Sequence, residues 1–381
     1  MELWVYDFNL QPIGLVTAAT SVLFNRSLAG VGTVEVRVSA SLAQASVLRP
    51  GRIIRLGGWP DMAALLVARA IETTREGQAL TVTGVQLKGL LSSRVIVPPT
   101  EAEDPNAYGY DRIAESPGET VLRHYIDRHA ITPKDANRKI PNMALEKTDR
   151  GRGTSAPWSA RWSALTDELQ DICEWTGLGY NVDLVLGQEQ IMLCRVIEGR
   201  DLSAGVSRVV FSPDFRTVYD VSYTDDPSSA RNTTYALGAG QDEKQVVRIV
   251  YTTPDGKQVE GPITGFSRAE STLSVGNLTD PEEIDMETTH SLQDSARQLR
   301  TLTATVRSGG HARYRVDWDL GDKVLVQLRL PALGETVSMA ATITNVLESY
   351  ERGSAAPRLD VTFGEAPISV SRALKTQIRR A

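Results

Sequence analysis

The sequence predicts a mainly β protein with a smaller α+β insert, and three observations support this prediction. Short segments in which polar and apolar residues alternate fill the first 97 residues and return after residue 204, as in half-buried strands. Glycines recur between these segments as turn residues. Between residues 98 and 204, two segments space their apolar side chains as amphipathic helices do.

The composition is that of a folded protein of several domains. The 381 residues exceed one ordinary core, and 41% hydrophobic with 23% charged residues is typical of a globular chain. The net charge of -6 is spread along the chain without a basic block, which disfavours sequence-nonspecific binding to nucleic acid. The N-terminus lacks the pattern of a signal peptide, no run is long enough to span a membrane, and Cys173 and Cys194 are expected to be buried thiols, so we expect folding in a cytosol.

Residues 1–97 are predicted to form a first β domain. A string of short strands at hairpin spacing favours a barrel or a sandwich, and one short helix, 42–48, interrupts it. The expected strands are 3–6, 21–27, 34–38, 52–56, 65–68 and 80–83.

Residues 98–204 are predicted to form the α+β insert. One helix is expected at 117–129, beginning near Pro117, and a second at 162–175, ending near Gly177. Between the helices, 134–157 is expected to be extended or mobile. A hairpin of strands 180–186 and 190–194 follows.

Residues 205–365 are predicted to form a second β-rich domain with one helix at 285–303, and 366–381 a basic tail that is helical at 370–380. The clearest pattern of this second β-rich domain is 315–328, where two alternating strands are expected on either side of a tight turn at Gly321. The other expected strands are 209–211, 218–223, 232–237, 245–251, 266–275, 339–350 and 358–363.

The four histidines are the first candidates for a catalytic base or a metal ligand. His124 and His129 are five residues apart on one expected helix, whereas a metal-binding pair on a helix face is normally four apart. We interpret these two as solvated histidines on the helix surface. His290 and His311 have no serine or cysteine motif beside them.

Paired carboxylates and a glycine pair are the remaining candidates for chemistry. The carboxylate pairs are 167/168, 225/226, 282/283 and 317/319, and glycosidase chemistry would need two carboxyl groups about 5 to 9 Å apart. Asp317 and Asp319 are expected on one strand face, as a solvated edge that discourages unwanted strand pairing. Gly238-Ala-Gly240 lacks the remaining signature of a phosphate loop and is predicted to be a turn or a bulge. Hydrolase, zincin and redox motifs are missing, so the sequence predicts no enzyme, no catalytic, cofactor-binding or metal-binding residues and no cofactor.

The tryptophans could offer stacking faces for sugars. Core packing is expected for at least four of the six, because a large apolar ring on a patterned face gains more from burial than from exposure. The six are Trp4, Trp59, Trp158, Trp162, Trp175 and Trp318.

The order of several short motifs resembles the baseplate hub proteins at the tail tip of long-tailed, non-contractile (siphovirus-type) bacteriophages, which are related to the hubs of contractile tails. The motifs span nearly the whole chain: 1–7, 24–26 before 31–36, 48–54, 82–84 leading into 90–96, 209–212, Asn232 before 238–240, and Tyr314 with 319–322. The resemblance implies two tail-tube-like β-barrel domains, 1–97 and 205–365, flanking the insert. It also implies a homotrimer, in which three copies of two similar barrels offer six equivalent surfaces to a hexameric tube.

The resemblance further implies a virion structural protein at the distal end of the tail, assembled in the bacterial host cytoplasm. It would connect the tail tube to the distal tail and help to gate genome passage. The implied partners are the tail tube subunit, the distal tail protein, the tape-measure protein and other tail-tip or fibre proteins, with DNA only in transit and no small-molecule substrate. Two alternatives remain: a carbohydrate-binding or carbohydrate-active β protein acting on the bacterial surface, and a hexameric tail-tube or sheath-adapter subunit.

Overall fold

The chain divides by its internal contacts into two compact units, which are described separately. Unit 1 comprises Met1–Asp220 and Ala304–Val361, and unit 2 comprises Val221–Thr303 and Thr362–Ala381. The computed structural model describes residues 2–41, 43–74, 77–99, 109–225, 231–240, 244–253, 257–276, 278–282, 284–285, 287–289, 292, 300–307, 312–331 and 334–364. Among these residues, no helix is both long and apolar enough to cross a membrane. The predicted division into three domains stays a prediction.

The N-terminal part of unit 1 is an antiparallel sheet, as the alternating sequence pattern predicts. On β3, for example, Val22 and Phe24 point inward and are fully buried, while the residues between them are half-buried. The strands are β1 (Leu3–Tyr6), β2 (Pro12–Val16), β3 (Ser21–Ser27), β4 (Thr33–Ser39), β5 (Ile53–Leu56), β6 (Ala63–Thr74) and β7 (Gly77–Gln86). The predicted short helix is a 3-10 helix, Ala43–Val47. Of these strands only β2 was not predicted.

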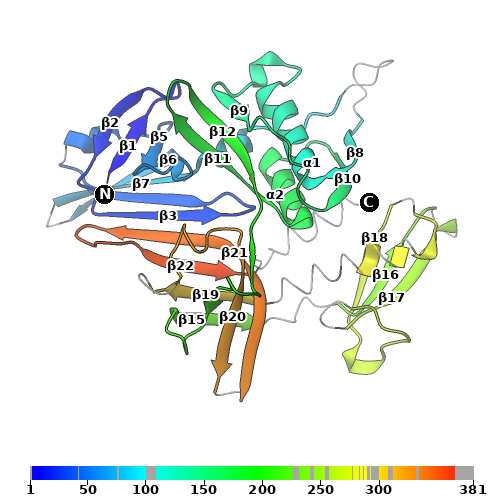
Figure 1. The fold of residues 1–381 in the computed structure, drawn as a ribbon. Helices are drawn as coiled ribbons and strands as arrows, with labels where there is room; N and C mark the ends of the chain where they lie inside the picture. The colour runs from blue at the N-terminus through cyan, green and yellow to red at the C-terminus, as the bar shows by residue number, and fades with distance from the viewer. Residues whose placement is uncertain are drawn as a thin grey trace. The chain divides into compact units, whose positions relative to one another are not determined.

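One long strand joins the N-terminal and C-terminal parts of unit 1 into a single sheet. The first half of β21 (Glu335–Glu351) pairs with β20 (Lys323–Leu330), and its second half pairs antiparallel with β3. Figure 1 shows β3 in blue beside β21 in orange. The sheet order is β15-β19-β22-β21-β3-β4-β7-β6-β5-β1-β2, with β13 and β14 paired to β20. The mainly β fold is therefore confirmed.

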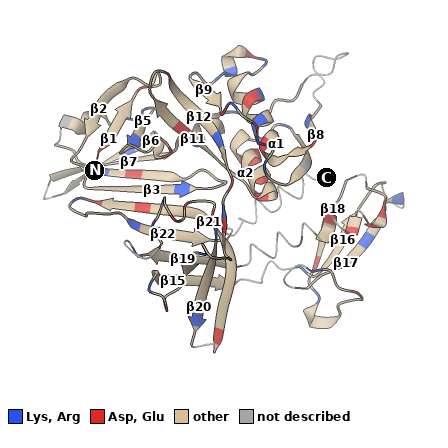
Figure 2. Cartoon of the chain, viewed as in Figure 1, with Lys and Arg blue, Asp and Glu red and all other residues tan. Residues whose placement is uncertain are grey.

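Three more predicted strands belong to this sheet, namely β14 (Val210–Phe211), β15 (Val218–Asp225) and β22 (Arg358–Phe363). The sheet also contains β13 (Asp201–Leu202) and β19 (Arg300–Val306). Strands β13 and β19 were not predicted. Positively and negatively charged residues are interspersed over the elements of both units (Figure 2).

The strand predicted at 315–320 is wrong, because these residues form turns. Arg315 has a φ of +64°, and the Arg313 carbonyl accepts hydrogen bonds from the amides of Val316 and Asp317. The alternating pattern was misleading here, since Trp318 is fully buried whereas Val316 is 58% exposed. The turn before β20 is confirmed, with Gly321 at a φ of +95°.

The insert contains the two predicted helices, α1 (Gly118–Ile126) and α2 (Leu165–Thr176). A π-helical turn, Asp127–Ile131, extends α1, and Gly177 ends α2 at a φ of +71°. The predicted hairpin consists of β11 (Gly179–Leu186) and β12 (Gln190–Ile197), and β9 (Met143–Leu145) pairs in parallel with β12. In a separate sheet, β8 (Asp111–Pro117) pairs with β10 (Ser155–Ala160).

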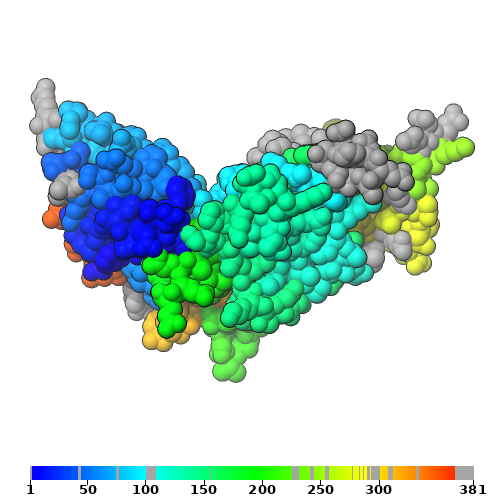
Figure 3. Space-filling model, turned by 90° about the horizontal axis from the view of Figure 1, so that it is seen from above, coloured from blue at the N-terminus to red at the C-terminus, as the bar shows by residue number. Residues whose placement is uncertain are grey.

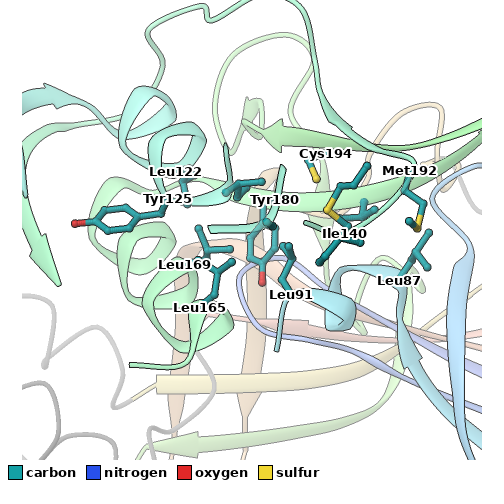
Figure 4. Close-up of a cluster of buried hydrophobic side chains, with 14 of the residues drawn as sticks. Leu87, Leu91, Leu122, Tyr125, Ile140, Leu165, Leu169, Tyr180, Met192 and Cys194 are labelled. Carbon is teal, nitrogen blue, oxygen red and sulfur yellow. The ribbon is translucent and has the colours of Figure 1, made fainter. Parts of the chain in front are cut away.

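A large apolar core holds the insert together. Leu122, Tyr125, Leu165 and Leu169 of the two helices pack with Tyr180 and other side chains of the hairpin, as Figure 4 shows. Leu87 and Leu91 belong to the same core, from the 3-10 helix Leu87–Ser93 that follows β7. The core of the insert is therefore continuous with the N-terminal strands. The N-terminal sheet and the insert appear as adjoining blue and teal lobes in Figure 3.

Unit 2 contains a three-stranded sheet in the order β17-β16-β18, with strands Val247–Tyr251, Thr233–Leu237 and Glu270–Ser274. Its core is small and includes Ala236, Leu273 and Ile284. Of the predicted helix 285–303, the described residues up to Leu292 are helical, but 300–303 belong to β19, so the predicted end of the helix is wrong. The predicted tail 366–381 lies outside the described residues.

Candidate functional site

The most elaborate polar arrangement in the structure is a buried charged cluster beside the junction of β3 and β21. The cluster consists of Arg26 on β3, Asp61 in the loop before β6, Tyr314, Arg315 and Asp319 in the turns before β20, and Glu348 on β21. These residues come from both ends of unit 1, and the fold alone brings them together.

Two arginines and three carboxylates form a continuous network in the charged cluster. Arg26 Nη2 is 2.7 Å from Asp61 Oδ2, and Arg26 Nη1 is 2.7 Å from Asp319 Oδ1. Arg315 Nη1 is 2.9 Å from Asp61 Oδ2, and Arg315 Nη2 is 3.1 Å from Glu348 Oε1. The Tyr314 hydroxyl donates to the same Glu348 oxygen at 2.7 Å. Each charge thus faces an opposite charge, as buried ions require.

Burial and the facing charges together set the pKa of Asp61 in the charged cluster. The side chain of Arg26 is 7% exposed and that of Glu348 is 2% exposed. Burial alone would raise the pKa of Asp61, but Arg26 and Arg315 together lower this pKa below its usual value. The network pairs both arginines with the three carboxylates. It can fasten two sequence-distant parts of the sheet in one register.

A second polar cluster lies between β8 and α1. The buried Asp111 carboxylate accepts contacts from His124 Nε2 at 3.0 Å and from His129 Nε2 at 2.7 Å, and Arg128 Nε lies 3.5 Å away. The side chain of His129 is 1% exposed, so its predicted place on the helix surface is wrong. The chain continues from α1 into a π-helical turn, whose wider spacing brings positions five apart to one side, and no sequence pattern indicated this turn. Among the described residues, no group of three or more His, Cys, Asp or Glu residues is arranged to hold a metal ion.

This second cluster predicts an acid-sensitive contribution to stability. Burial would raise the pKa of Asp111, but hydrogen bonds from His124 and His129 and the charge of Arg128 hold it well below its usual range. A carboxyl pKa lower in the folded than in the unfolded state stabilises the fold above about pH 4, and this contribution is lost as the pH falls. We expect urea unfolding to show a smaller stability difference between wild type and Asp111→Asn at pH 3 than at pH 6. An equal difference at both pH values would contradict the assignment.

Lys88 is a fully buried cation that the sequence did not indicate. Its Nζ donates to the carbonyl oxygens of Ser27 at 2.7 Å, Leu28 at 3.1 Å and Tyr180 at 3.0 Å, and lies 4.5 Å from the centre of the Tyr180 ring. It therefore links β3, the helix after β7 and the hairpin of the insert. Burial lowers the pKa of this ammonium to about 7, and Arg26 contributes to the lowering.

The lowered pKa of Lys88 predicts that stability rises with pH. Between pH 7 and about 10.4, the unfolded lysine holds a proton that the folded one has released, so the folded state gains as the pH increases. Relative to Lys88→Met, we expect the wild type to gain about 1 kcal/mol in free energy of unfolding between pH 6 and pH 8. Urea titrations of both proteins at the two pH values measure this gain. A constant difference between the proteins would show that Lys88 stays protonated throughout.

The structure separates the paired carboxylates named from the sequence. Asp317 contacts Arg313, and Asp319 faces Arg26 in the charged cluster. The predicted strand edge is wrong for both residues, because 315–320 form turns. Glu168 is buried and accepts from Trp158 Nε1 at 2.7 Å and Ser163 Oγ at 2.6 Å. The pairs 225/226 and 282/283, as well as His290 and His311, lie partly or wholly outside the described residues.

The other sequence candidates have structural roles. Gly238-Ala-Gly240 forms the predicted turn after β16, with Gly240 at a φ of +100°. Cys173 and Cys194 are buried free thiols, as predicted, and burial raises the pKa of both.

The tryptophans divide largely as predicted. Trp318 is fully buried, Trp4 and Trp158 pack partly buried against the insert core, and Trp175 is half-buried. Trp59 and Trp162 are 51% and 52% exposed. The indole of Trp59 lies under Arg315, whose guanidinium carbon is 4.4 Å from the ring centre.

Comparison with known proteins relates nearly the whole chain to bacteriophage proteins. The family model of the Siphovirus ReqiPepy6 Gp37-like protein matches residues 2–365. A comparison with curated protein sequences finds no match.

Three solved structures share the fold along almost their entire length. They are the tail protein from Neisseria meningitidis MC58 (TM-score 0.58, 12% identity, 96% of each chain covered), the 43 kDa tail protein of prophage MuSo2 from Shewanella oneidensis (0.59, 11%, 96% of this chain and 99% of that chain) and the prophage tail protein gp18 from Listeria monocytogenes EGD-e (0.54, 12%, 99% and 98%). At these identities the likeness establishes a common fold.

Proposed function

Because the chain belongs to the Siphovirus ReqiPepy6 Gp37-like protein family, we propose that it is a structural hub at the tip of a bacteriophage tail. The observation that supports this most strongly is the shared fold with three tail proteins over 96–99% of the chain, which leaves no large segment for a different task. The polar clusters agree with a structural role. The arginines and carboxylates of the charged cluster, for example, face one another inside unit 1.

The hub would act as a homotrimer around the tail axis. Three copies that each contribute two similar β-rich barrels, 1–97 and 205–365, would present six comparable surfaces to a hexameric tail tube. The partners would be the tube subunit, the distal tail protein, the tape-measure protein and other tail-tip or fibre proteins. DNA would pass the hub only in transit, and the hub would help to gate that passage. Binding between such subunits depends on buried area and complementarity, not on a reactive side chain.

Native mass spectrometry of the purified full chain tests this proposal. The expected species is a trimer with three times the 41.6 kDa mass of one chain, either alone or after addition of the tail tube subunit from the same particle. A hexamer would instead support a tube or adapter subunit. A stable dimer that does not change on addition of the tube subunit would overturn the proposal.

A further inference from the structure

The three-stranded sheet of unit 2, whose strands lie side by side in Figure 1, has one covered face and one open face. On the covered face, Ala236 of β16 and Leu273 of β18 pack with Ile284 of the helical segment that follows β18, and Val250 of β17 is 1% exposed. Side chains alternate between the two faces along each strand. The open face is therefore formed by the residues between these positions, namely Tyr235, Leu237, Val247, Ile249, Tyr251 and Thr272.

The open face is mainly apolar. Tyr235 lies directly opposite Ile249 across the two strands, and Leu237 lies directly opposite Val247. Ile249 is 44% exposed and Val247 is 49% exposed. Since the apolar face of a sheet normally packs against another element, this face is expected to have a cover.

Charged side chains border the open face at one end. Arg268 donates to the Tyr235 hydroxyl at 3.0 Å, and its Nε lies 2.6 Å from a carboxylate oxygen of Glu270. A cover for this face therefore needs apolar side chains toward the sheet and polar side chains at its margins.

The C-terminal segment, residues 366–381, has such a pattern in its sequence. It belongs to the same unit as the sheet and lies beyond the described residues. In a helix, Val370, Leu374 and Ile378 would share one side, because they are four residues apart. The basic residues Arg372, Lys375 and Arg379 would then lie on the opposite side. A helix over 370–380 would be about 16 Å long, which is about the length of a five-residue strand such as β16.

The distribution of charge favours this segment over other covers. Residues 221–303 of unit 2 contain 13 acidic and 7 basic residues, a net charge of -6, whereas 366–381 contains four basic residues and no acidic one. Pairing the open faces of two copies would bring two acidic regions together, and an anionic lipid surface would meet the same repulsion. The segment is also part of the same chain, so it needs no separate encounter to reach the face.

We propose that the C-terminal segment folds as an amphipathic helix over the open face of the unit 2 sheet of its own chain. Val370, Leu374 and Ile378 contact the apolar side chains of β16 and β17, and the basic residues face solvent and the acidic surroundings. The sheet then has a helical layer on each face, and a surface that would favour unspecific association is removed from water. The proposal does not depend on the role at the tail tip, and either can fail alone.

Hydrogen–deuterium exchange of the full chain, read by mass spectrometry, tests the cover with two variants. Leu374→Asp with Ile378→Asp places charges on the apolar side of the helix. Ser369→Asp with Thr376→Asp makes the same change in charge on its polar side and is the matched control. In the first variant, the amides of β16 and β17 are expected to exchange at least tenfold faster than in the wild type, because an uncovered sheet opens more often. The control variant should exchange like the wild type.

Cysteine pairs test the contact itself. Ile249→Cys is combined in turn with Val370→Cys, Leu374→Cys and Ile378→Cys, and with Thr376→Cys as the control on the polar side. The two native cysteines are buried and do not interfere. Under mild oxidation, at least one of the three pairs is expected to form a disulfide within one chain at least tenfold faster than the control pair, since a disulfide needs close Cβ atoms.

Three results would overturn the proposal. The first is equal exchange of β16 and β17 in the two aspartate variants. The second is a rate of disulfide formation that is the same for all three pairs and for the control pair. The third is a disulfide that joins two chains in preference to closing within one, which would show that the segment covers a neighbouring copy.

Discussion

Asp61→Ala is expected to lower the free energy of unfolding by about 3–5 kcal/mol, the cost of removing one partner from a buried ion pair. Asp61 is the one carboxylate that contacts both arginines of the charged cluster, at 2.7 Å and 2.9 Å. Its loss would leave Arg26 and Arg315 with less compensation in a site from which water is largely excluded. Urea unfolding at pH 7 measures the change.

An exposed pair within the same sheet provides the control. Arg37 and Glu35 lie 2.8 Å apart on β4, but the arginine side chain is 60% exposed. Because water screens such a pair, Arg37→Ala should change the free energy of unfolding by less than about 1 kcal/mol. Equal effects of Asp61→Ala and Arg37→Ala would mean that the charged cluster does not hold the sheet together.

Trp318→Ala is expected to destabilise the protein by about 3–5 kcal/mol, because it leaves a large cavity in a core that cannot fully collapse. The indole is fully buried, with ring centres 5.3 Å from Phe211 and 4.8 Å from Tyr314. The substitution would therefore also disturb Tyr314, which donates to Glu348 in the charged cluster. Urea unfolding of both proteins at pH 7 measures the loss in free energy of unfolding.

Val316→Ala is the matched control, two residues away in the same turn. Val316 is 58% exposed, so its truncation should cost less than about 0.5 kcal/mol. A strand at 315–320 with one buried face would bury both side chains and make both substitutions costly. Comparable losses in the two variants would thus contradict the turn.

Local patterns predicted the elements of this fold well, and long-range contacts account for most of what they missed. The amphipathic spacing located α1 and α2, and the alternating residues located β3 and β21. That β3 and β21 pair with each other depends on residues more than 300 positions apart, and no periodicity carries that information. The error at 315–320 has the same origin, because Arg315 adopts a positive φ where it contacts Asp61 and Glu348.

The polar sites were harder to predict than the elements. Lys88, Asp61 and Asp111 are single polar residues within apolar or mixed segments, and only the fold shows that each is buried among partners. His129 was assigned to the surface because the expected helix was regular, whereas the actual helix continues as a π-helical turn. Trp162 is 52% exposed and Trp318 is fully buried, a difference that the sequence pattern did not show.

Electron cryomicroscopy of the intact particle that contains this chain tests the proposed role most directly. The account predicts three copies in one ring at the distal end of the tail, in contact with the last hexameric ring of the tail tube. Six copies in a ring within the tube, or a location outside the tail, would contradict it.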